Sequence, residues 1–258
     1  MNVIIVIVLL STFALWEIPL LFILIFGSRE TSRRWKFFYE DKAINLIFLM
    51  FRQYRGFRIQ LENKLAGPLP ERYIVLSNHQ SLLDIPIIMH VLPKGSHARF
   101  VAKQELGFGV PLISLLLRTS GHCLIRRRGD ALQAMRTVTS MARRCSREAT
   151  VPVVFPEGTR SRTGELGVFH AAGARKILDV EPLPVLVVAV DGGWDVSNLA
   201  EFMASFGRKP YRIRFIEVLP APQGRKAALD VMEKSRELIG ASLAAMRREA
   251  TPDMAARG

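Results

Sequence analysis

A histidine and an aspartate lie five residues apart in the stretch Asn78-His79-Gln80-Ser81-Leu82-Leu83-Asp84. An imidazole can take a proton from a hydroxyl near neutral pH, and a carboxylate on its other ring nitrogen orients it and stabilises the imidazolium. A turn at the start of a helix would bring Asp84 back beneath His79, so the two are a candidate general base and its partner. Alternatively, Ser81 and Asp84 form a capping-box-like helix start, which is a purely structural role.

Three other polar groups also follow apolar runs. Phe155-Pro156-Glu157-Gly158-Thr159-Arg160-Ser161 follows the run at 151–155, and a guanidinium such as that of Arg160 suits bidentate phosphate contact. Lys103 ends the run at 98–102, and three arginines, Arg126 to Arg128, end the run that starts at Cys123. Each group taken singly is also typical of a solvated strand end.

Strands and helices alternate in the pattern that would position these groups. The apolar runs predict strands at 57–61, 73–77, 98–102, 123–126, 151–155, 184–190 and 213–218. Helical spacing predicts helices at 31–54, 82–91, 110–118, 131–147, 172–178 and 225–248. The expected fold class is α/β, with a mixed, largely parallel sheet covered by helices. Ligands of such sheets bind at the carboxyl ends of the strands, where His79 would lie.

The first residues predict a hydrophobic membrane-anchoring helix. Residues 3–26 are long and apolar enough to cross a bilayer, which needs about 20 residues. Basic residues at 29–36 place the following side in the cytoplasm. Glu17 and Pro19 leave a second arrangement open, in which the segment kinks and lies in one leaflet together with 44–51. The expected organisation is an anchor with a basic and apolar helix at 1–54, an α/β domain at 55–250 and a loose tail at 251–258.

Composition narrows the class of partner. The 258 residues carry 36 Lys+Arg against 23 Asp+Glu, a formal net charge of +13, and 49% are hydrophobic. Such a charge favours polyanionic partners, and the high hydrophobic content favours a membrane surface over nucleic acid. The two cysteines, Cys123 and Cys145, are too few for a disulfide framework, and both lie in apolar stretches typical of packing residues.

Taken together, these blocks resemble the glycerolipid acyltransferase family, which includes the 1-acylglycerol-3-phosphate (lysophosphatidic acid) acyltransferases. The family pattern is an NH-x4-D block, a Lys-Glu-Leu segment, a Gly-x5-Arg block, a Phe-Pro-Glu-Gly-Thr-Arg-Ser block and a proline-led apolar strand. The matching segments are 78–84, 103–106, 121–127, 155–161 and 184–190. Three positions depart from the pattern: Arg126 replaces an acidic residue, His170 stands where a lysine is usual, and Val187 replaces a second proline.

The resemblance implies a role for each matched residue. His79 becomes the general base and Asp84 its orienting partner. The phosphate would be bound by Lys103, Arg127 and Arg160, and the acceptor site shaped by Glu157, Gly158 and Thr159. No metal and no bound cofactor is expected.

The resemblance also implies an activity and a location. The chain would transfer an acyl group from acyl-CoA or acyl carrier protein to the sn-2 hydroxyl of lysophosphatidic acid, at the cytoplasmic face of a bacterial inner membrane. One alternative is a sister enzyme that acts on another lysophospholipid or a lyso-aminolipid. Another is a non-catalytic basic module tethered to the membrane, which would leave the two most specific blocks, 78–84 and 155–161, unexplained.

Overall fold

Seven strands form one mixed sheet in the computed structural model, which describes residues 2–126, 130–194 and 210–250. The strands are β1 (Ile59–Asn63), β2 (Ile74–Ser77), β3 (Ala98–Lys103), β4 (Cys123–Ile125), β5 (Val151–Val154), β6 (Val185–Asp191) and β7 (Tyr211–Leu219). Their spatial order is β1-β7-β6-β2-β5-β3-β4, and among these described strands the β6–β7 pairing alone is antiparallel. The predicted fold class is therefore confirmed.

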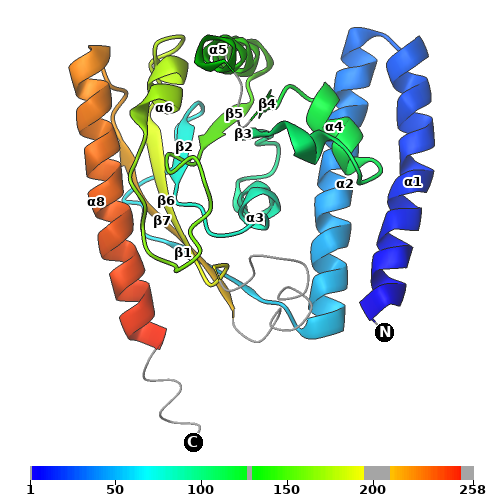
Figure 1. The fold of residues 1–258 in the computed structure, drawn as a ribbon, viewed down its shortest axis with the longest axis horizontal. Coiled ribbons are helices and arrows are strands. Elements are labelled where there is room, and N and C mark those ends of the chain that lie inside the picture. The colour runs from blue at the N-terminus through cyan, green and yellow to red at the C-terminus, as the bar shows by residue number, and fades with distance from the viewer. Residues whose placement is uncertain (1, 127–129, 195–209, 251–258) are drawn as a thin grey trace, which may run out of the picture.

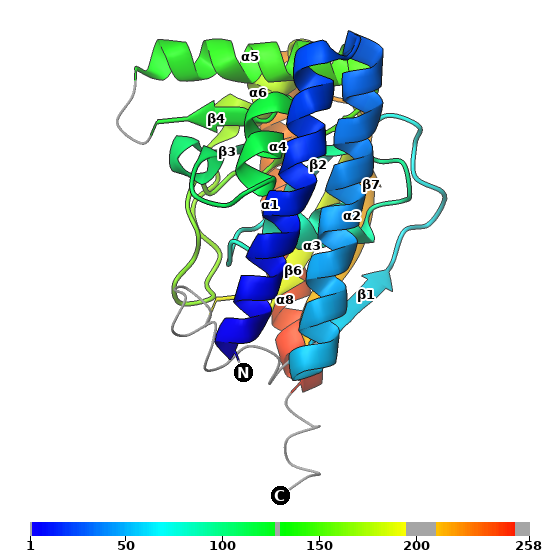
Figure 2. The ribbon, with the colours of Figure 1, turned by 90° about the vertical axis from the view of Figure 1, so that its right-hand side faces the viewer.

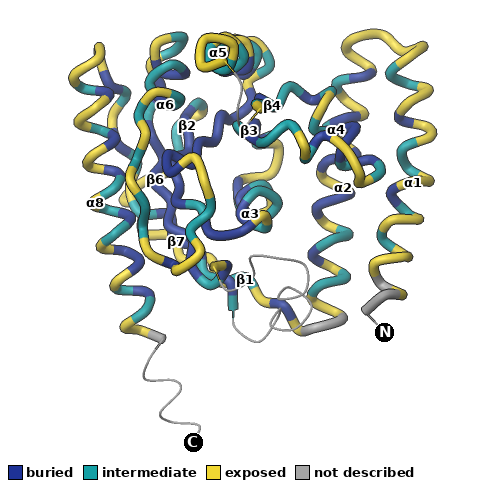
Figure 3. The backbone as a smooth tube through the Cα atoms, viewed as in Figure 1, coloured by how far each residue is buried: buried dark blue, intermediate teal, exposed yellow. Residues whose placement is uncertain are grey.

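Helices cover both faces of the sheet (Figure 1). The described α-helices are α1 (Asn2–Phe26), α2 (Arg29–Arg55), α3 (Asp84–Val91), α4 (Ile113–Thr119), α5 (Ala131–Glu148), α6 (Ala171–Leu178) and α8 (Gly224–Ala250), and all except α1 and α4 pack on the sheet. Successive strand residues point to opposite faces. Ile74 and Leu76 of β2 accordingly pack under α5, α6 and α8, whereas Val75 packs with α3 and the second half of α2. Because both faces are covered, the central strands are buried throughout, as the tube in Figure 3 shows.

The two N-terminal helices form an antiparallel hairpin beside the sheet (Figure 2). Phe13 and Leu20 of α1 are buried against Tyr39 and Ala43 of α2 and the first turns of α4. The rest of α1 presents large apolar side chains to the outside, including Ile18, Phe22, Ile25 and Phe26. Residues 6–26 are long and apolar enough to cross a membrane. The helix continues without interruption through Pro19.

The second arrangement considered for the anchor places residues 44–51 in a leaflet with the first segment. Of these residues, Ile44 and Phe48 are buried in the core on one face of the sheet, whereas Leu49 is 55% exposed. Ile44 and Phe48 belong to the half of α2 that packs on the domain, where they cover Val75 and its neighbours.

Several predicted boundaries shift, two of them for a clear local reason. The strand predicted at 57–61 begins at Ile59, because Gly56 ends α2 in the left-handed region and Phe57 donates its N–H back to Phe51. The helix predicted at 82–91 begins at Asp84, whose carboxylate holds the preceding turn. The helix predicted at 110–118 begins at residue 113, and the strand predicted at 123–126 ends at 125. The tail at 251–258 lies outside the described residues.

Candidate active site

The predicted site residues converge because β2, β5 and β3 are neighbours and parallel. Their carboxyl ends meet at one edge of the sheet, where a cavity of about 390 Å³ opens. The cavity is lined, among others, by these predicted residues: His79, Lys103, Gly158, Thr159 and Arg160. Arg127 lies outside the described residues.

The His79 imidazole lies 2.6 Å from the Asp84 carboxylate, measured from Nδ1 to Oδ2. Asp84 is fully buried, and His79 retains 14% exposure of its side chain toward the cavity. A carboxylate can only accept from Nδ1–H, and in that tautomer Nε2 is the ring nitrogen left to act as a base at the cavity that His79 lines. The geometry is that of a general base with an orienting carboxylate.

Four donors compensate for the burial of the Asp84 carboxylate. Oδ2 also accepts the backbone N–H of Gln80 at 2.7 Å and that of Ser81 at 2.9 Å. Oδ1 accepts the hydroxyl of Tyr211, a residue of β7 that sequence reasoning missed. The turn also has the contacts of the capping-box-like alternative, because the Ser81 N–H donates to Asp84 at 2.9 Å and the Leu83 N–H donates to the Ser81 hydroxyl at 3.3 Å. Asp84 serves the turn before the helix and the His79 ring.

Apolar side chains form most of the cavity wall. Phe155 stacks on the His79 ring with centroids 4.2 Å apart and planes inclined by 13°, which holds the ring plane. The aliphatic part of the lining includes these side chains: Leu82, Ile85, Val101, Leu106, Ile125, Met135 and Val138. Lys103 and Arg160 bring cationic groups to the same cavity, and the His170 ring lies near Gly158. The cavity therefore combines an apolar space with a candidate base and two cationic side chains.

Glu157 lies behind the cavity wall rather than in its lining. Its Oε1 accepts the backbone N–H of His79 at 2.7 Å, and its Oε2 accepts that of Gly167 at 2.8 Å. Burial raises the pKa of this carboxyl, and the two N–H donors partly offset the rise. The carboxylate thus ties the His79 turn to the loop that follows β5. In return the His79 carbonyl accepts the N–H of Ser161 at 2.8 Å.

Comparison with known proteins assigns the chain to a family. The sequence profile of the Acyltransferase family matches residues 58–191, which contain both the His79–Asp84 turn and the loop after β5. The chain belongs to the Acyltransferase family. It is similar to a 1-acyl-sn-glycerol-3-phosphate acyltransferase alpha of Ovis aries, 33% identical over 138 residues, covering 51% of this chain and 46% of that protein. A 1-acyl-sn-glycerol-3-phosphate acyltransferase of Cocos nucifera is 33% identical over 121 residues, covering 47% and 38%.

A solved structure extends the likeness to the whole acyltransferase fold. The crystal structure of the 1-acyl-sn-glycerophosphate (LPA) acyltransferase PlsC of Thermotoga maritima matches with a TM-score of 0.61, covering 96% of this chain and 98% of that one. At 21% identity this match speaks to the fold alone. The chain spans less than half the length of each of these two curated relatives.

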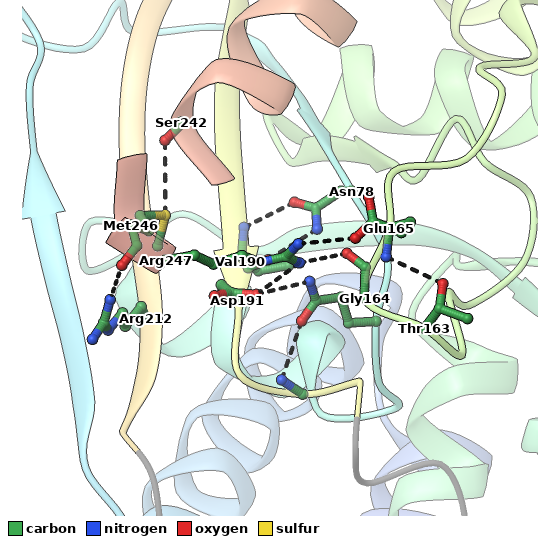
Figure 4. Close-up of polar contacts among 12 residues, drawn as sticks. Asn78, Thr163, Gly164, Glu165, Val190, Asp191, Arg212, Ser242, Met246 and Arg247 are labelled. Carbon is green, nitrogen blue, oxygen red and sulfur yellow. Dashed lines mark hydrogen bonds and ion pairs between the residues drawn. The ribbon is translucent and has the colours of Figure 1, made fainter. Parts of the chain in front are cut away.

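A second set of contacts supports the acyltransferase site from β6, the loop after β5 and α8 (Figure 4). Asn78 donates to the carbonyl of Val190 at 2.9 Å and accepts its N–H at 2.8 Å, which fastens the end of β2 to β6. Gln80 donates to Asp191 at 3.2 Å. Arg247 of α8 contacts the same Asp191 oxygen at 3.3 Å and also donates to the carbonyl of Gly164. These contacts link the C-terminal helix to the catalytic turn.

The two thiols lie in the core of the acyltransferase domain. Cys123 and Cys145 are 0% and 2% exposed, and both belong to the hydrophobic cluster under α5. Burial raises the pKa of the Cys123 thiol to about 12 and also raises that of Cys145. A thiol with a raised pKa carries little thiolate near neutral pH, so neither cysteine is suited to act as a nucleophile. This agrees with their prediction as packing residues. Among the described residues no three His, Cys, Asp or Glu side chains gather as a metal site would require.

Proposed function

We propose that this acyltransferase transfers an acyl group from a thioester to the sn-2 hydroxyl of 1-acylglycerol-3-phosphate, which yields phosphatidic acid. The observation that carries the proposal is the His79–Asp84 pair at a cavity that also holds Lys103 and Arg160. The names of the curated relatives support the choice of acceptor.

The chemistry needs a base, because a thioester is already activated. His79 Nε2 takes the proton of the acceptor hydroxyl as its oxygen attacks the thioester carbonyl. The tetrahedral intermediate collapses, the carbon–sulfur bond breaks, and the imidazolium returns the proton to the departing thiolate. Asp84 holds the Nδ1 proton throughout and stabilises the imidazolium. No acyl-enzyme forms in this scheme, which agrees with two buried thiols.

The cavity has a cationic part, which suits the phosphate of the acceptor, and an aliphatic part, which suits an acyl chain. Lys103 and Arg160 supply cations for the phosphate. A phosphate-binding role for Arg127 is expected from its place in the sequence pattern. The aliphatic lining between α3, β3 and α5 suits an acyl chain. Acyl-CoA or acyl carrier protein is the donor, with no bound cofactor.

The helical hairpin supports attachment to a membrane. The outward side chains of α1 form a continuous apolar surface that lipid would cover. We place the protein at a bacterial inner membrane with its catalytic domain on the cytoplasmic side, because the basic residues that open α2 favour that orientation. Phe22→Glu with Ile25→Glu should release the protein from anionic vesicles in a flotation assay, whereas binding that persists would contradict this role for α1.

The central test is thiol release from acyl-CoA or acyl carrier protein across a panel of lysolipids. His79→Ala should lower turnover about 10²–10⁴-fold while the unfolding temperature and vesicle binding stay unchanged. Near-normal turnover of this variant would contradict the mechanism.

Arg160→Ala tests the acceptor. A hydrogen bond to a charged group contributes about 1.5–3 kcal/mol, so kcat/KM for lysophosphatidate should fall by roughly one to two orders of magnitude. The loss should be much smaller for a monoacylglycerol, which has no phosphate. A uniform loss would make Arg160 structural, and a wild-type preference for a phosphodiester lysolipid would favour the sister-enzyme alternative.

A further inference from the structure

A basic groove lies between α5 and α6, outside the catalytic cavity. Its volume is about 790 Å³. Its charged lining comprises Arg136, Arg143 and Arg147 of α5 and Lys176 of α6. The arginines are spaced by seven and then four residues, which at 3.6 residues per turn aligns them in one stripe along α5.

The charges of this groove are not compensated within the described part of the chain. None of its four cations forms an ion pair with an acidic side chain there. Arg144 on the same helix, by contrast, pairs with Glu148 at 2.9 Å. Like charges along one stripe repel each other, and an acidic partner would turn that repulsion into attraction.

The groove adjoins the catalytic cavity at Met135, which lines both. From there it follows α5 to Arg147, a run of about 18 Å at the rise of an α-helix. Near Met135 its lining includes Leu132, which is largely exposed. A partner seated in the groove therefore has its near end at the cavity that holds His79.

We propose that this groove, defined by Arg136, Arg143, Arg147 and Lys176, is a docking surface for the acidic helical face of an acyl carrier protein. The inference rests on the proposed function and names the donor that the catalytic cavity alone leaves open. The carrier's phosphopantetheine arm would pass Met135 and place the thioester beside His79, while the acidic helix lies along the arginine stripe.

Two features favour a carrier protein over other polyanions. The groove lining includes no aromatic ring on which an adenine would stack, and its cations are spread along a helix rather than gathered around one phosphate site. Moreover, α5 and α6 pack on the sheet face opposite the one covered by α3 and the second half of α2, so the groove is not part of the exposed apolar surface of α1 (Figure 1).

The test compares donors in a charge-reversed variant. For Arg143→Glu with Arg147→Glu, kcat/KM for palmitoyl-acyl carrier protein should fall about 10–100-fold at low salt, and the difference from wild type should shrink as salt screens the charges. With palmitoyl-CoA and the same acceptor the change should stay below about threefold. Lys94→Glu, an exposed cation in the turn after α3, makes the same kind of charge change and should leave both donors unaffected.

Other outcomes would overturn the inference. Equal losses with both donors would assign the stripe to coenzyme A or to the cavity itself, and weaker binding of the variant to anionic vesicles would assign it to the membrane. Unchanged kinetics would mean that nothing docks there. Wild-type transfer from palmitoyl-CoA but not from the carrier protein would refute the docking surface alone, whereas transfer from neither donor would refute the proposed function.

Discussion

Glu157→Gln separates two roles for a residue that the sequence pattern assigns to the acceptor site. The wild-type carboxylate accepts the N–H groups of His79 at 2.7 Å and Gly167 at 2.8 Å. The amide keeps one acceptor oxygen and turns an NH₂ toward the other N–H. One charge-assisted hydrogen bond of about 1.5–3 kcal/mol is lost and one buried donor is left unpaired.

The loss should appear in kcat, because the displaced backbone is that of the general base itself. A shift of about 1 Å in a reacting group can lower a rate about 10²-fold, so we expect kcat to fall about 10–100-fold with KM for lysophosphatidate changed less than about threefold. Steady-state kinetics on saturating donor measure both constants. Glu217→Gln, the same change at an exposed position of β7, is the control. A raised KM with normal kcat would refute the reasoning and return Glu157 to the acceptor.

Three further predictions test other parts of the structure. Arg247→Met should lower kcat about tenfold without raising either KM, because Arg247 supports Asp191 and the loop after β5. Arg247→Lys should recover part of the activity, and an effect on KM alone would exclude this supporting role. Cys123→Ser with Cys145→Ser should retain activity, and an acyl group trapped on either wild-type thiol in mass spectrometry would contradict direct attack. Burial, together with Arg99, lowers the pKa of His97 to about 4 from 6.5, so the unfolded chain takes up a proton that the fold excludes. Stability should therefore fall as pH drops from about 6.5 toward 4, and urea titrations should show a shallower fall for His97→Phe; an equally steep fall would exclude His97 as a source.

The convergence of the site residues follows from sequence alone, but the strand order does not. His79, Lys103 and Arg160 each lie within five residues after an apolar run, and in a parallel sheet such positions share one edge. The chain order of the runs does not reveal that β5 inserts between β2 and β3. That insertion is what places the Phe155–Arg160 turn directly beside the His79 turn.

Contacts that depend on distant pairing or on backbone atoms have no signature in the sequence. Tyr211 reaches Asp84 across 127 positions, and its place depends on the antiparallel pairing of β6 with β7. Glu157 binds only backbone N–H groups, which every residue except proline carries, so no partner residue type could identify its role. In the same way, the apolar first segment predicts a membrane anchor, whereas its packing on α2 and α4 depends on the turn at Gly27 and Ser28.

The two most specific sequence blocks act as one structural unit. Asp84 holds the catalytic turn through the N–H groups of Gln80 and Ser81, and Glu157 of the other block holds it through the N–H of His79. The His79 carbonyl is held in turn by Ser161. With the backbone fixed on both sides and Nδ1 bound to Asp84, the imidazole has a single orientation that presents Nε2 to the cavity. Such preorganisation lets the base act without rearrangement during the reaction, and it requires both blocks at once. A chain that kept the His79–Asp84 spacing but lost the acid at 157 would therefore keep the pair, but the backbone that orients the imidazole would no longer be held.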